Sequence, residues 1–271
     1  MKKSIAIVFI STLFLACNNH STDKDQDPDI MPVTSGIKAP EKINYTIISQ
    51  FPHDTSAYTQ GLEIFNGKMY EGTGDYETSS LRITNWKTGA VEKKHLMGST
   101  EIFGEGITIF KNKIYQLTWE NHEAYLYDIN NIEKKIKTFA WPYEGWGLTH
   151  DSASLIISDG SSNLYFVDAE TFKVKNTISV KDDQGPVMLL NELEYVNGVI
   201  YANVYQSNYI VKIDAESGHV TGKLTLEGLL QPQDYTPNRT DVLNGIAYDS
   251  TNNTFLITGK RWPKMFQIKL D

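Results

Sequence analysis

The fold is decided by five copies of one short element: Gln60-Gly61-Leu62, Glu105-Gly106-Ile107, Trp146-Gly147-Leu148, Asn191-Glu192-Leu193 and Asn244-Gly245-Ile246. The copies begin 45, 41, 45 and 53 residues apart, and each is followed by two or three short β-patterned runs. A period of about 40 to 50 residues that contains about four strands is typical of a β-propeller, in which each repeat forms one blade around a central axis. The sequence therefore predicts an all-β fold, a five-bladed β-propeller.

The later strands of the repeats follow one template. The second strand is predicted at residues 68–70, 113–115, 155–157, 199–201 and 255–257, and a third strand at 164–167, 209–212 and 265–268. Turn residues precede most of the second strands, as in Asn66-Gly67 and Asn197-Gly198. Because these residues tolerate positive φ, they favour two-residue hairpins.

The last repeat is too short to form a whole blade. Only 28 residues run from Asn244 to Asp271, which is enough for about three strands. Residues 44–49 precede the first repeat and have strand character. We expect this N-terminal strand to complete the C-terminal blade and close the ring, because closure protects the sheet edges that an open ring would expose.

Composition sets limits on the class of protein. The chain has 271 residues, of which 40% are apolar, and this suits a soluble protein with a large core. Its net charge of −8 argues against nucleic acid or an anionic membrane surface as a partner, because neither would be attracted to an acidic protein. The single cysteine excludes an internal disulfide.

The N-terminal residues 1–17 look like a bacterial signal peptide. Lys2 and Lys3 precede an apolar run over residues 5–15, and Leu15-Ala16-Cys17 matches a lipoprotein cleavage site, so Cys17 is the expected lipidation site. The alternative is a plain secretory signal, because Phe14 stands where lipoprotein signals usually have leucine. The apolar run is shorter than the ~20 residues that a membrane span requires.

Residues 18–42 are polar and predict a disordered tether, so the folded domain is expected at 43–271. This organisation predicts an exported protein of the bacterial cell envelope, lipid-anchored and facing either the periplasm or the outside.

Matching positions of the innermost strands meet at one mouth of a propeller channel. The first tier of such positions comprises Gln60, Glu105, Trp146, Asn191 and Asn244. The second tier, five or six residues past the start of each second strand, comprises Gly74, Trp119, Gly160, Tyr205 and Lys260. These tiers combine one carboxylate, one ammonium group, several amides and three large aromatic side chains.

The same tiers argue against metal-dependent or covalent chemistry. A calcium-like ion needs several oxygen ligands, and Glu105 is the only carboxylate in the tiers. The histidines His53, His95, His122, His150 and His219 fall at unrelated repeat positions, and we expect them in surface or loop positions. No serine or cysteine lies in a nucleophile-elbow context. We therefore expect no metal and no cofactor.

Six motifs in order resemble the plant and bacterial type of glutaminyl-peptide cyclotransferase. They are residues 53–62 (His-Asp-Thr-Ser-Ala-Tyr-Thr-Gln-Gly-Leu), 103–106 (Phe-Gly-Glu-Gly), 144–149 (Glu-Gly-Trp-Gly-Leu-Thr), 191–195 (Asn-Glu-Leu-Glu-Tyr), 242–247 (Val-Leu-Asn-Gly-Ile-Ala) and 258–263 (Thr-Gly-Lys-Arg-Trp-Pro). The resemblance extends over residues 43–270. It implies a metal-independent enzyme that converts an N-terminal glutaminyl residue of a peptide or protein to pyroglutamyl and releases ammonia.

That reaction suits the residues of the two tiers. The α-amine of the substrate attacks its own γ-amide carbonyl, so the protein has to orient the side chain and move a proton. Glu105 is the expected shuttle from the attacking amine to the leaving nitrogen, and the aromatic Trp119 and Trp146 should raise its pKa by desolvation. A single closed propeller needs no partner subunit, so we expect a monomer.

The remaining candidate residues are expected to bind the substrate. Gln60 and Asn191 offer amides to its polar groups, and Asn191 or Lys260 is placed to stabilise oxyanion character at the γ-carbon. The expected walls are Tyr58, Trp119, Trp146 and Tyr205. Tyr58 stands where the family usually has phenylalanine and Tyr205 where it usually has tryptophan, which predicts a slightly wider or more polar pocket.

Two other functions stay open from the sequence: a propeller that binds peptides or proteins without catalysis, and a metal-dependent lactonase or esterase on a similar propeller. Simpler structural roles also exist for single residues. Glu105 would then solvate the channel, Trp146 would pack between blades and Lys260 would be a surface charge. Trp86, Trp141 and Trp262 lie off the tiers and are predicted to be packing residues.

Overall fold

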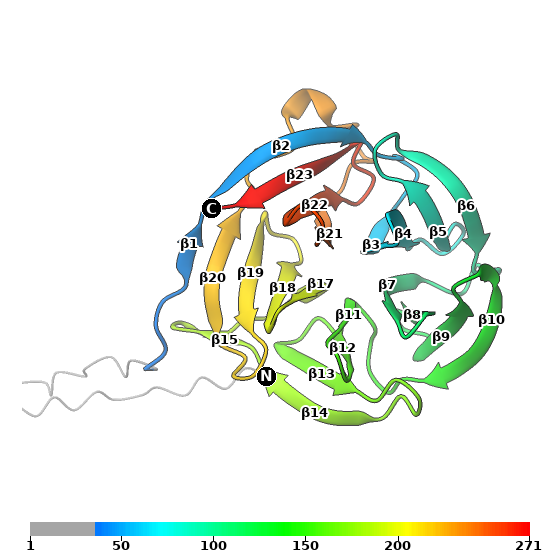
Figure 1. Cartoon of the computed structure of the whole chain (residues 1–271), viewed down its shortest axis with the longest axis horizontal. Coiled ribbons are helices and arrows are strands. Elements are labelled where there is room, and N and C mark those ends of the chain that lie inside the picture. The colour runs from blue at the N-terminus through cyan, green and yellow to red at the C-terminus, as the bar shows by residue number, and fades with distance from the viewer. Residues whose placement is uncertain (1–35) are drawn as a thin grey trace, which may run out of the picture. The chain divides into compact units, whose positions relative to one another are not determined.

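The computed structural model of the chain describes residues 36–271, and these form a five-bladed β-propeller (Figure 1). The predicted signal peptide at 1–17, the lipidation site Cys17 and the tether residues 18–35 lie outside the described residues. In the part of the chain that the structure describes, no helix has the length and apolar character needed to cross a membrane.

Each blade is an antiparallel sheet whose strands run in chain order from the central channel outward. Blade one contains β3 (Thr59–Phe65), β4 (Lys68–Thr73), β5 (Ser80–Asn85) and β6 (Ala90–Leu96). Blade two contains β7 (Gly104–Phe110), β8 (Lys113–Thr118), β9 (Glu123–Asp128) and β10 (Asn131–Ala140). Blade three contains β11 (Leu148–His150), β12 (Leu155–Ser158), β13 (Asn163–Val167) and β14 (Val174–Ser179).

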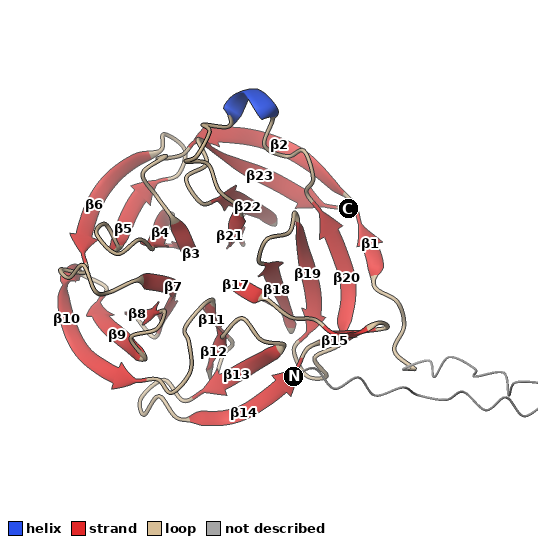
Figure 2. Ribbon diagram, turned by 180° about the vertical axis from the view of Figure 1, so that it is seen from behind, coloured by secondary structure: helices blue, strands red, loops and turns tan. Residues whose placement is uncertain are grey.

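Blade four contains β17 (Leu190–Val196), β18 (Val199–Val204), β19 (Tyr209–Asp214) and β20 (Val220–Thr225). Blade five takes β21 (Leu243–Asp249), β22 (Thr254–Gly259) and β23 (Lys264–Leu270) from the C-terminal end of the chain. A small hairpin, β15 (Lys181–Asp182) with β16 (Gly185–Pro186), precedes blade four. A short 3-10 helix, η1 (Pro232–Asp234), lies at the outer edge beside blade five and is blue in Figure 2.

The ring closes through an N-terminal strand, as the sequence predicts. Strand β2 (Tyr45–Pro52) pairs antiparallel with β23, from Tyr45 opposite Leu270 to Pro52 opposite Lys264, and forms the outer strand of blade five. It extends three residues beyond the predicted segment. Strands from the N-terminal and C-terminal parts of the domain therefore share one sheet, and β23 is left without an unpaired edge within the ring.

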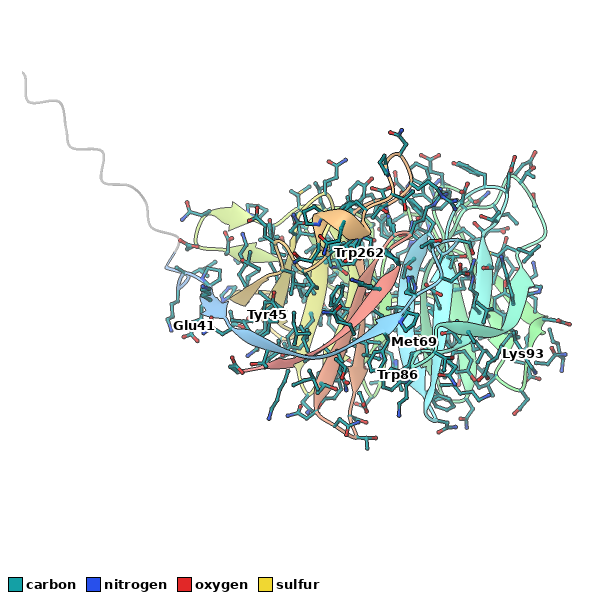
Figure 3. The ribbon with its side chains drawn as sticks, turned by 90° about the horizontal axis from the view of Figure 1, so that it is seen from above. Glu41, Tyr45, Met69, Trp86, Lys93 and Trp262 are labelled. Carbon is teal, nitrogen blue, oxygen red and sulfur yellow. The ribbon has the colours of Figure 1, made fainter. Side chains whose placement is uncertain are left out.

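An additional strand precedes β2. Strand β1 (Glu41–Ile43) pairs parallel with β20 at the outer edge of blade four, so regular structure begins two residues before the predicted domain boundary. Figure 3 labels Glu41 and Tyr45, which mark the starts of β1 and β2.

The predicted hairpin turns are present. Asn66 and Gly67 have φ values of 50° and 75°, and Asn197 and Gly198 have values of 50° and 86°. Positive φ at both central residues matches the twist of the flanking strands, and asparagine and glycine adopt it with little strain.

Five hydrophobic clusters fill the spaces between neighbouring blades, one for each contact around the ring. The cluster between blades five and one includes Leu62, Met69 and Leu256, with Trp86 packed against it. Met69 and Trp86 are labelled in Figure 3. Trp141 and Trp262 are also buried in interblade clusters, so all three tryptophans predicted to be packing residues have that role.

The inner strands approach each other closely at the glycine of the repeated element. A Cβ on Gly61 would lie 2.5 Å from the amide nitrogen of Ile107, and one on Gly147 would lie 1.9 Å from the carbonyl oxygen of Asn191. Glu192 replaces this glycine in blade four. Its buried carboxylate accepts hydrogen bonds from the backbone N–H groups of Leu62 (3.1 Å) and Ile246 (2.8 Å), and so links blade four to blades one and five.

Candidate active site

One pocket of about 200 Å³ contains every residue that the sequence places in the site. It is lined by Tyr58, Gln60, Glu105, Trp119, Trp146, Asn191, Tyr205 and Lys260, together with Phe103. Gln60, Glu105 and Asn191 are each the second residue of an inner strand, and Trp119, Tyr205 and Lys260 each follow directly after a second strand. The pocket therefore lies at the end of the channel where the inner strands begin.

A repeated irregularity in strand pairing accompanies the inward polar side chains. The register between the inner and second strands shifts at the same place in four blades, between residues 59 and 61, 104 and 107, 190 and 193, and 243 and 246. A β-bulge adds one residue to a strand and redirects its side chains. The first-tier residues Gln60, Glu105, Asn191 and Asn244 all lie in these bulges.

Two glycines of the second tier leave room for aromatic rings. A Cβ on Gly160 would lie 2.7 Å from the indole of Trp146, and one on Gly74 would lie 2.2 Å from the ring of Phe103. Real Cβ atoms do not approach other atoms this closely. The second tier therefore alternates between side chains that form the wall and glycines on which the wall packs.

Glu105 is buried and hydrogen-bonded at one oxygen. Its side chain is 5% exposed, and Oε1 accepts a hydrogen bond of 2.9 Å from Nε2 of Gln60. The Gln60 amide is oriented in turn by Asn244, whose Nδ2 donates to Oε1 of Gln60 at 3.2 Å. Because Asn244 donates to the oxygen of this amide, the nitrogen faces Glu105.

The surroundings of Glu105 raise the pKa of its carboxyl group well above the ordinary value. Burial is the largest cause, the charge of Lys260 acts in the opposite direction, and the charge of Glu144 adds to the increase. A carboxylate with a raised pKa is a stronger base near neutral pH and a competent acid after it has gained a proton. The raised pKa of Glu105 agrees with the expectation from the sequence.

Lys260 lies inside the pocket rather than on the surface. It is 3% exposed, and its Nζ lies 4.7 Å from the ring centroid of Tyr58 and 4.9 Å from that of Tyr205. Burial lowers its pKa, while the charges of Glu105 and Asp241 oppose this effect. Cation–π contacts replace part of the hydration that the ammonium group loses.

The aromatic walls are connected to polar groups behind them. The hydroxyl of Tyr58 donates a hydrogen bond of 3.0 Å to Oδ2 of Asp241, and burial raises its pKa, so the hydroxyl stays protonated at neutral pH. Trp119 packs edge-to-face on Phe103 with 5.7 Å between centroids, and Trp146 packs edge-to-face on Tyr205 with 5.5 Å.

Asn191 lines the pocket and has a hydrogen-bond acceptor without a partner in the described part of the chain. Its Oδ1 is buried and has no hydrogen-bond partner among residues 36–271. A buried acceptor without a partner is costly, and a bound molecule with an N–H group would remove that cost.

Two residues of the site were not predicted from the sequence. Phe103 and Glu144 are the first residues of two motifs quoted above, and this was the available signal: Phe103 directly precedes the inner strand β7, and Glu144 lies two residues before Trp146.

Of the five histidines expected in surface or loop positions, His95 lies instead in strand β6 and His150 in the inner strand β11, where its Nδ1 is 2.8 Å from Oγ1 of Thr108. His53 lies in a loop, as expected, but its side chain is only 6% exposed, and it donates hydrogen bonds to the carbonyl oxygen of Trp262 and to Glu71.

Within residues 36–271, no cluster of three or more His, Cys, Asp or Glu side chains could hold a metal ion.

Comparison with known proteins agrees with this geometry. The sequence profile of the family described as "Glutamine cyclotransferase" matches residues 12–270. The chain is 40% identical over 227 residues to a glutaminyl-peptide cyclotransferase of Arabidopsis thaliana. The aligned region covers 83% of this chain and 70% of that protein. It is also similar to the crystal structure of a glutaminyl cyclase from Myxococcus xanthus, with a TM-score of 0.79, 33% identity, and coverage of 86% of this chain and 98% of the other.

Proposed function

The chain belongs to the glutamine cyclotransferase family, and we propose that Glu105 carries the proton in its reaction, the conversion of N-terminal glutaminyl residues of peptides to pyroglutamyl residues with release of ammonia. The observation that supports this role is the buried carboxyl of Glu105, with its raised pKa, in a pocket walled by aromatic rings.

The reaction needs one proton to move between two nitrogens of the substrate. The α-amine nitrogen forms a bond to the γ-carbonyl carbon, and the bond from that carbon to the amide nitrogen breaks. Glu105 accepts the proton that the attacking amine loses and donates it to the departing NH₂ group, which leaves as ammonia. The ring closes within one molecule, so correct folding of the substrate side chain supplies a large part of the rate.

The hydrogen bond from Gln60 selects which oxygen of Glu105 does this work. Gln60 occupies Oε1, and we assign the proton transfer to Oε2. General acid–base assistance of this kind typically contributes about 10² to 10⁴ in rate.

Asn191 and Lys260 are the proposed contacts for the polar groups of the substrate. The open Oδ1 of Asn191 suits an N–H donor, such as the α-amine. The buried ammonium of Lys260 suits the γ-carbonyl oxygen, on which negative charge develops as the amine attacks. Tyr58, Trp119, Trp146 and Tyr205 would enclose the aliphatic part of the glutaminyl side chain.

The test is a cyclisation assay on a short glutaminyl peptide, in which wild type and Glu105→Gln are compared with and without a metal chelator. We expect the wild type to release ammonia equally under both conditions and the variant to lose turnover, while it keeps its thermal stability and its affinity for the peptide. A near-normal rate in Glu105→Gln would remove Glu105 from the mechanism. Loss of wild-type activity in chelator would argue for a metal-dependent reaction.

For the N-terminal region we propose export and lipid anchoring at Cys17, with a monomeric catalytic domain. The basis is the sequence pattern at residues 1–17. Metabolic labelling with a radioactive fatty acid in a bacterial host should mark the wild type but not Cys17→Ser. Labelling of Cys17→Ser would contradict lipid anchoring at Cys17. Sedimentation of residues 36–271 should give the mass of one chain, and the mass of a dimer would contradict the monomeric state.

A further inference from the structure

Glu144 is hydrogen-bonded to both tryptophans of the pocket. It lies in the loop between β10 and β11, and its Oε2 accepts a hydrogen bond of 2.8 Å from Nε1 of Trp119 and one of 2.9 Å from Nε1 of Trp146. The two tryptophans come from neighbouring blades. One carboxylate oxygen therefore sets the orientation of two walls of the active site.

The backbone around Glu144 is fixed against blade two. The N–H of Gly145 donates to the carbonyl oxygen of Trp119 at 3.2 Å, and the carbonyl oxygen of Glu144 accepts from Nε1 of Trp141 at 3.0 Å. A Cβ on Gly145 would lie 2.5 Å from the carbonyl oxygen of Thr118, so glycine is required for this close approach. The carboxylate is thus held at a defined place relative to the indoles.

The side-chain torsions alone leave the indoles with a choice of orientation. Torsions between a tetrahedral carbon and an aromatic ring are broad and roughly two-fold, so the torsion itself does not fix where the indole N–H points. In the structure, Nε1 of each indole points toward Glu144. A charge-assisted hydrogen bond is about twice as strong as a neutral one, and two of them on one oxygen favour a single orientation of each wall.

We propose that Glu144 is a positioning residue for the cyclisation reaction, which orients the indoles of Trp119 and Trp146 through its Oε2 and acts through its negative charge on Glu105, which lines the same pocket as both indoles. The second part rests on the proposed role of Glu105 as the proton carrier. The first part does not depend on it.

The electrostatic part can be given a sign. Three titratable or charged groups face Glu105 from the surrounding elements: Lys260 after β22, Glu144 before β11 and Tyr58 before β3. Burial contributes most to the raised pKa of Glu105, Lys260 lowers that pKa, and Glu144 raises it. Removal of the Glu144 charge should therefore lower the pKa of Glu105. Since the reaction begins with ionised Glu105, the acid limb of the kcat/KM profile should move to lower pH.

Two substitutions separate the two parts. Glu144→Gln keeps an oxygen that can accept both indole N–H groups but removes the charge. Glu144→Leu removes the charge and the acceptor together. Glu120→Gln is the matched control, because Glu120 is an exposed carboxylate next to Trp119 in the chain. Each protein is measured for its pH profile of kcat/KM, for KM and for tryptophan emission with and without a non-cyclising peptide analogue.

We expect Glu144→Gln to keep KM within about twofold of wild type and to shift the acid limb to lower pH. Glu144→Leu should raise KM by roughly tenfold or more, the equivalent of losing one or two charge-assisted hydrogen bonds, and should change the tryptophan emission. Glu120→Gln should match the wild type. The amine of the substrate titrates equally in all assays, so differences between the profiles report on the enzyme.

The possible failures are distinguishable. Wild-type KM and emission in Glu144→Leu would show that packing alone orients the indoles. An unshifted acid limb in Glu144→Gln, with Glu105→Gln inactive, would overturn the electrostatic part. An active Glu105→Gln would instead overturn the role of Glu105 as the proton carrier. In that case the KM and the tryptophan emission of Glu144→Leu would still decide whether Glu144 orients the two indoles. If the leucine variant does not fold, Glu144→Asp, which withdraws the carboxylate by one methylene, takes its place.

Discussion

Lys260 and Glu144 act on the same carboxyl group in opposite directions. Glu105 has little contact with water, so the charges of these two neighbours are poorly screened. Lys260 favours the ionised form of Glu105 and Glu144 favours the protonated form. The pH range in which the carboxyl works as a base therefore depends on single neighbouring residues.

The first residue-scale prediction concerns Lys260→Met, which keeps the length of the side chain and removes its charge. Loss of the cation should raise the pKa of Glu105 further, so the acid limb of the kcat/KM profile should move to higher pH, opposite to the change expected for Glu144→Gln. The value of kcat should also fall, because Lys260 is the proposed contact for the developing oxyanion. A pH–rate profile that coincides with that of the wild type would show that Lys260 does not act on Glu105.

A second residue-scale prediction concerns Trp146→Ala. The indole packs on Gly160 and Tyr205 at the pocket, so its removal should mainly weaken substrate binding and raise KM by roughly tenfold or more. Trp141→Ala is the control, because Trp141 is fully buried between blades two and three and its loss should cost about 3 to 5 kcal/mol of stability. Thermal unfolding and KM are measured for both. If Trp146→Ala unfolds the domain, Trp146 is primarily a packing residue.

At the scale of structural elements, His53 connects the loop before β3 with the loop after β22. Its Nδ1 lies 2.8 Å from the carbonyl oxygen of Trp262, and its Nε2 lies 3.1 Å from Oε1 of Glu71. Both neighbours are acceptors, so both ring nitrogens carry a proton and the side chain is an imidazolium. The two connected loops carry Tyr58 and Lys260, which are residues of the active site.

The pH dependence of stability follows from this arrangement. Burial disfavours the charged imidazole, but the charge and hydrogen bond of Glu71 outweigh this effect and raise the pKa of His53 in the folded protein. The stabilisation is therefore complete below the unfolded pKa of about 6.5 and is lost as pH rises through the folded pKa.

We therefore predict that the melting temperature falls when the pH is raised across this range, and that His53→Gln removes this component. The variant should be less stable by about 3 to 5 kcal/mol at pH 6, because it leaves Glu71 as a buried charge without its partner. Thermal unfolding at several pH values measures both effects. His219, which is half-buried in the loop before β20, provides a control in His219→Gln. The same pH dependence in wild type and His53→Gln would contradict the assignment of an imidazolium.

At the scale of the whole molecule, stability depends on the closure of the ring by β2. This strand covers β23, and Phe51 on β2 packs edge-to-face on Trp86 of blade one at 5.0 Å. The outer strand of blade five thus takes part in the contact between the last blade and the first. A propeller without it would expose an edge and part of an interblade cluster.

Truncation tests this dependence. A chain that begins at His53 lacks β2, and we expect it to unfold at a much lower temperature and to aggregate, because the edge of β23 becomes available to other chains. A chain that begins at Asn44 lacks only β1, which adds three residue pairs at an outer edge, and it should keep its activity. Thermal unfolding and size-exclusion chromatography compare the two. A stable, active chain that starts at His53 would show that closure by β2 is dispensable.

Much of the architecture and the membership of the pocket could be predicted because the repeat imposes symmetry. Gln60, Glu105 and Asn191 occupy the same position in the repeats of blades one, two and four, so their meeting at one mouth follows without knowledge of side-chain contacts. Phe103 and Glu144 were missed because they lie outside the two tiers. The burial of His53 in its loop could not be predicted because its partners, Glu71 and Trp262, are 18 and 209 residues away, and no local pattern indicates that they surround it.

The sequence by itself determined the number of blades, the strand that closes the ring and the residue types that gather at the channel mouth, because these depend on periodicity and on local turn and strand preferences. Only the tertiary structure decided the opposing effects of Lys260 and Glu144 on the pKa of Glu105, the shared oxygen of Glu144 and the charged state of His53. Those properties depend on burial and on distances of about 3 Å between groups that are far apart in the chain. Such distances arise only when the five sheets pack against one another.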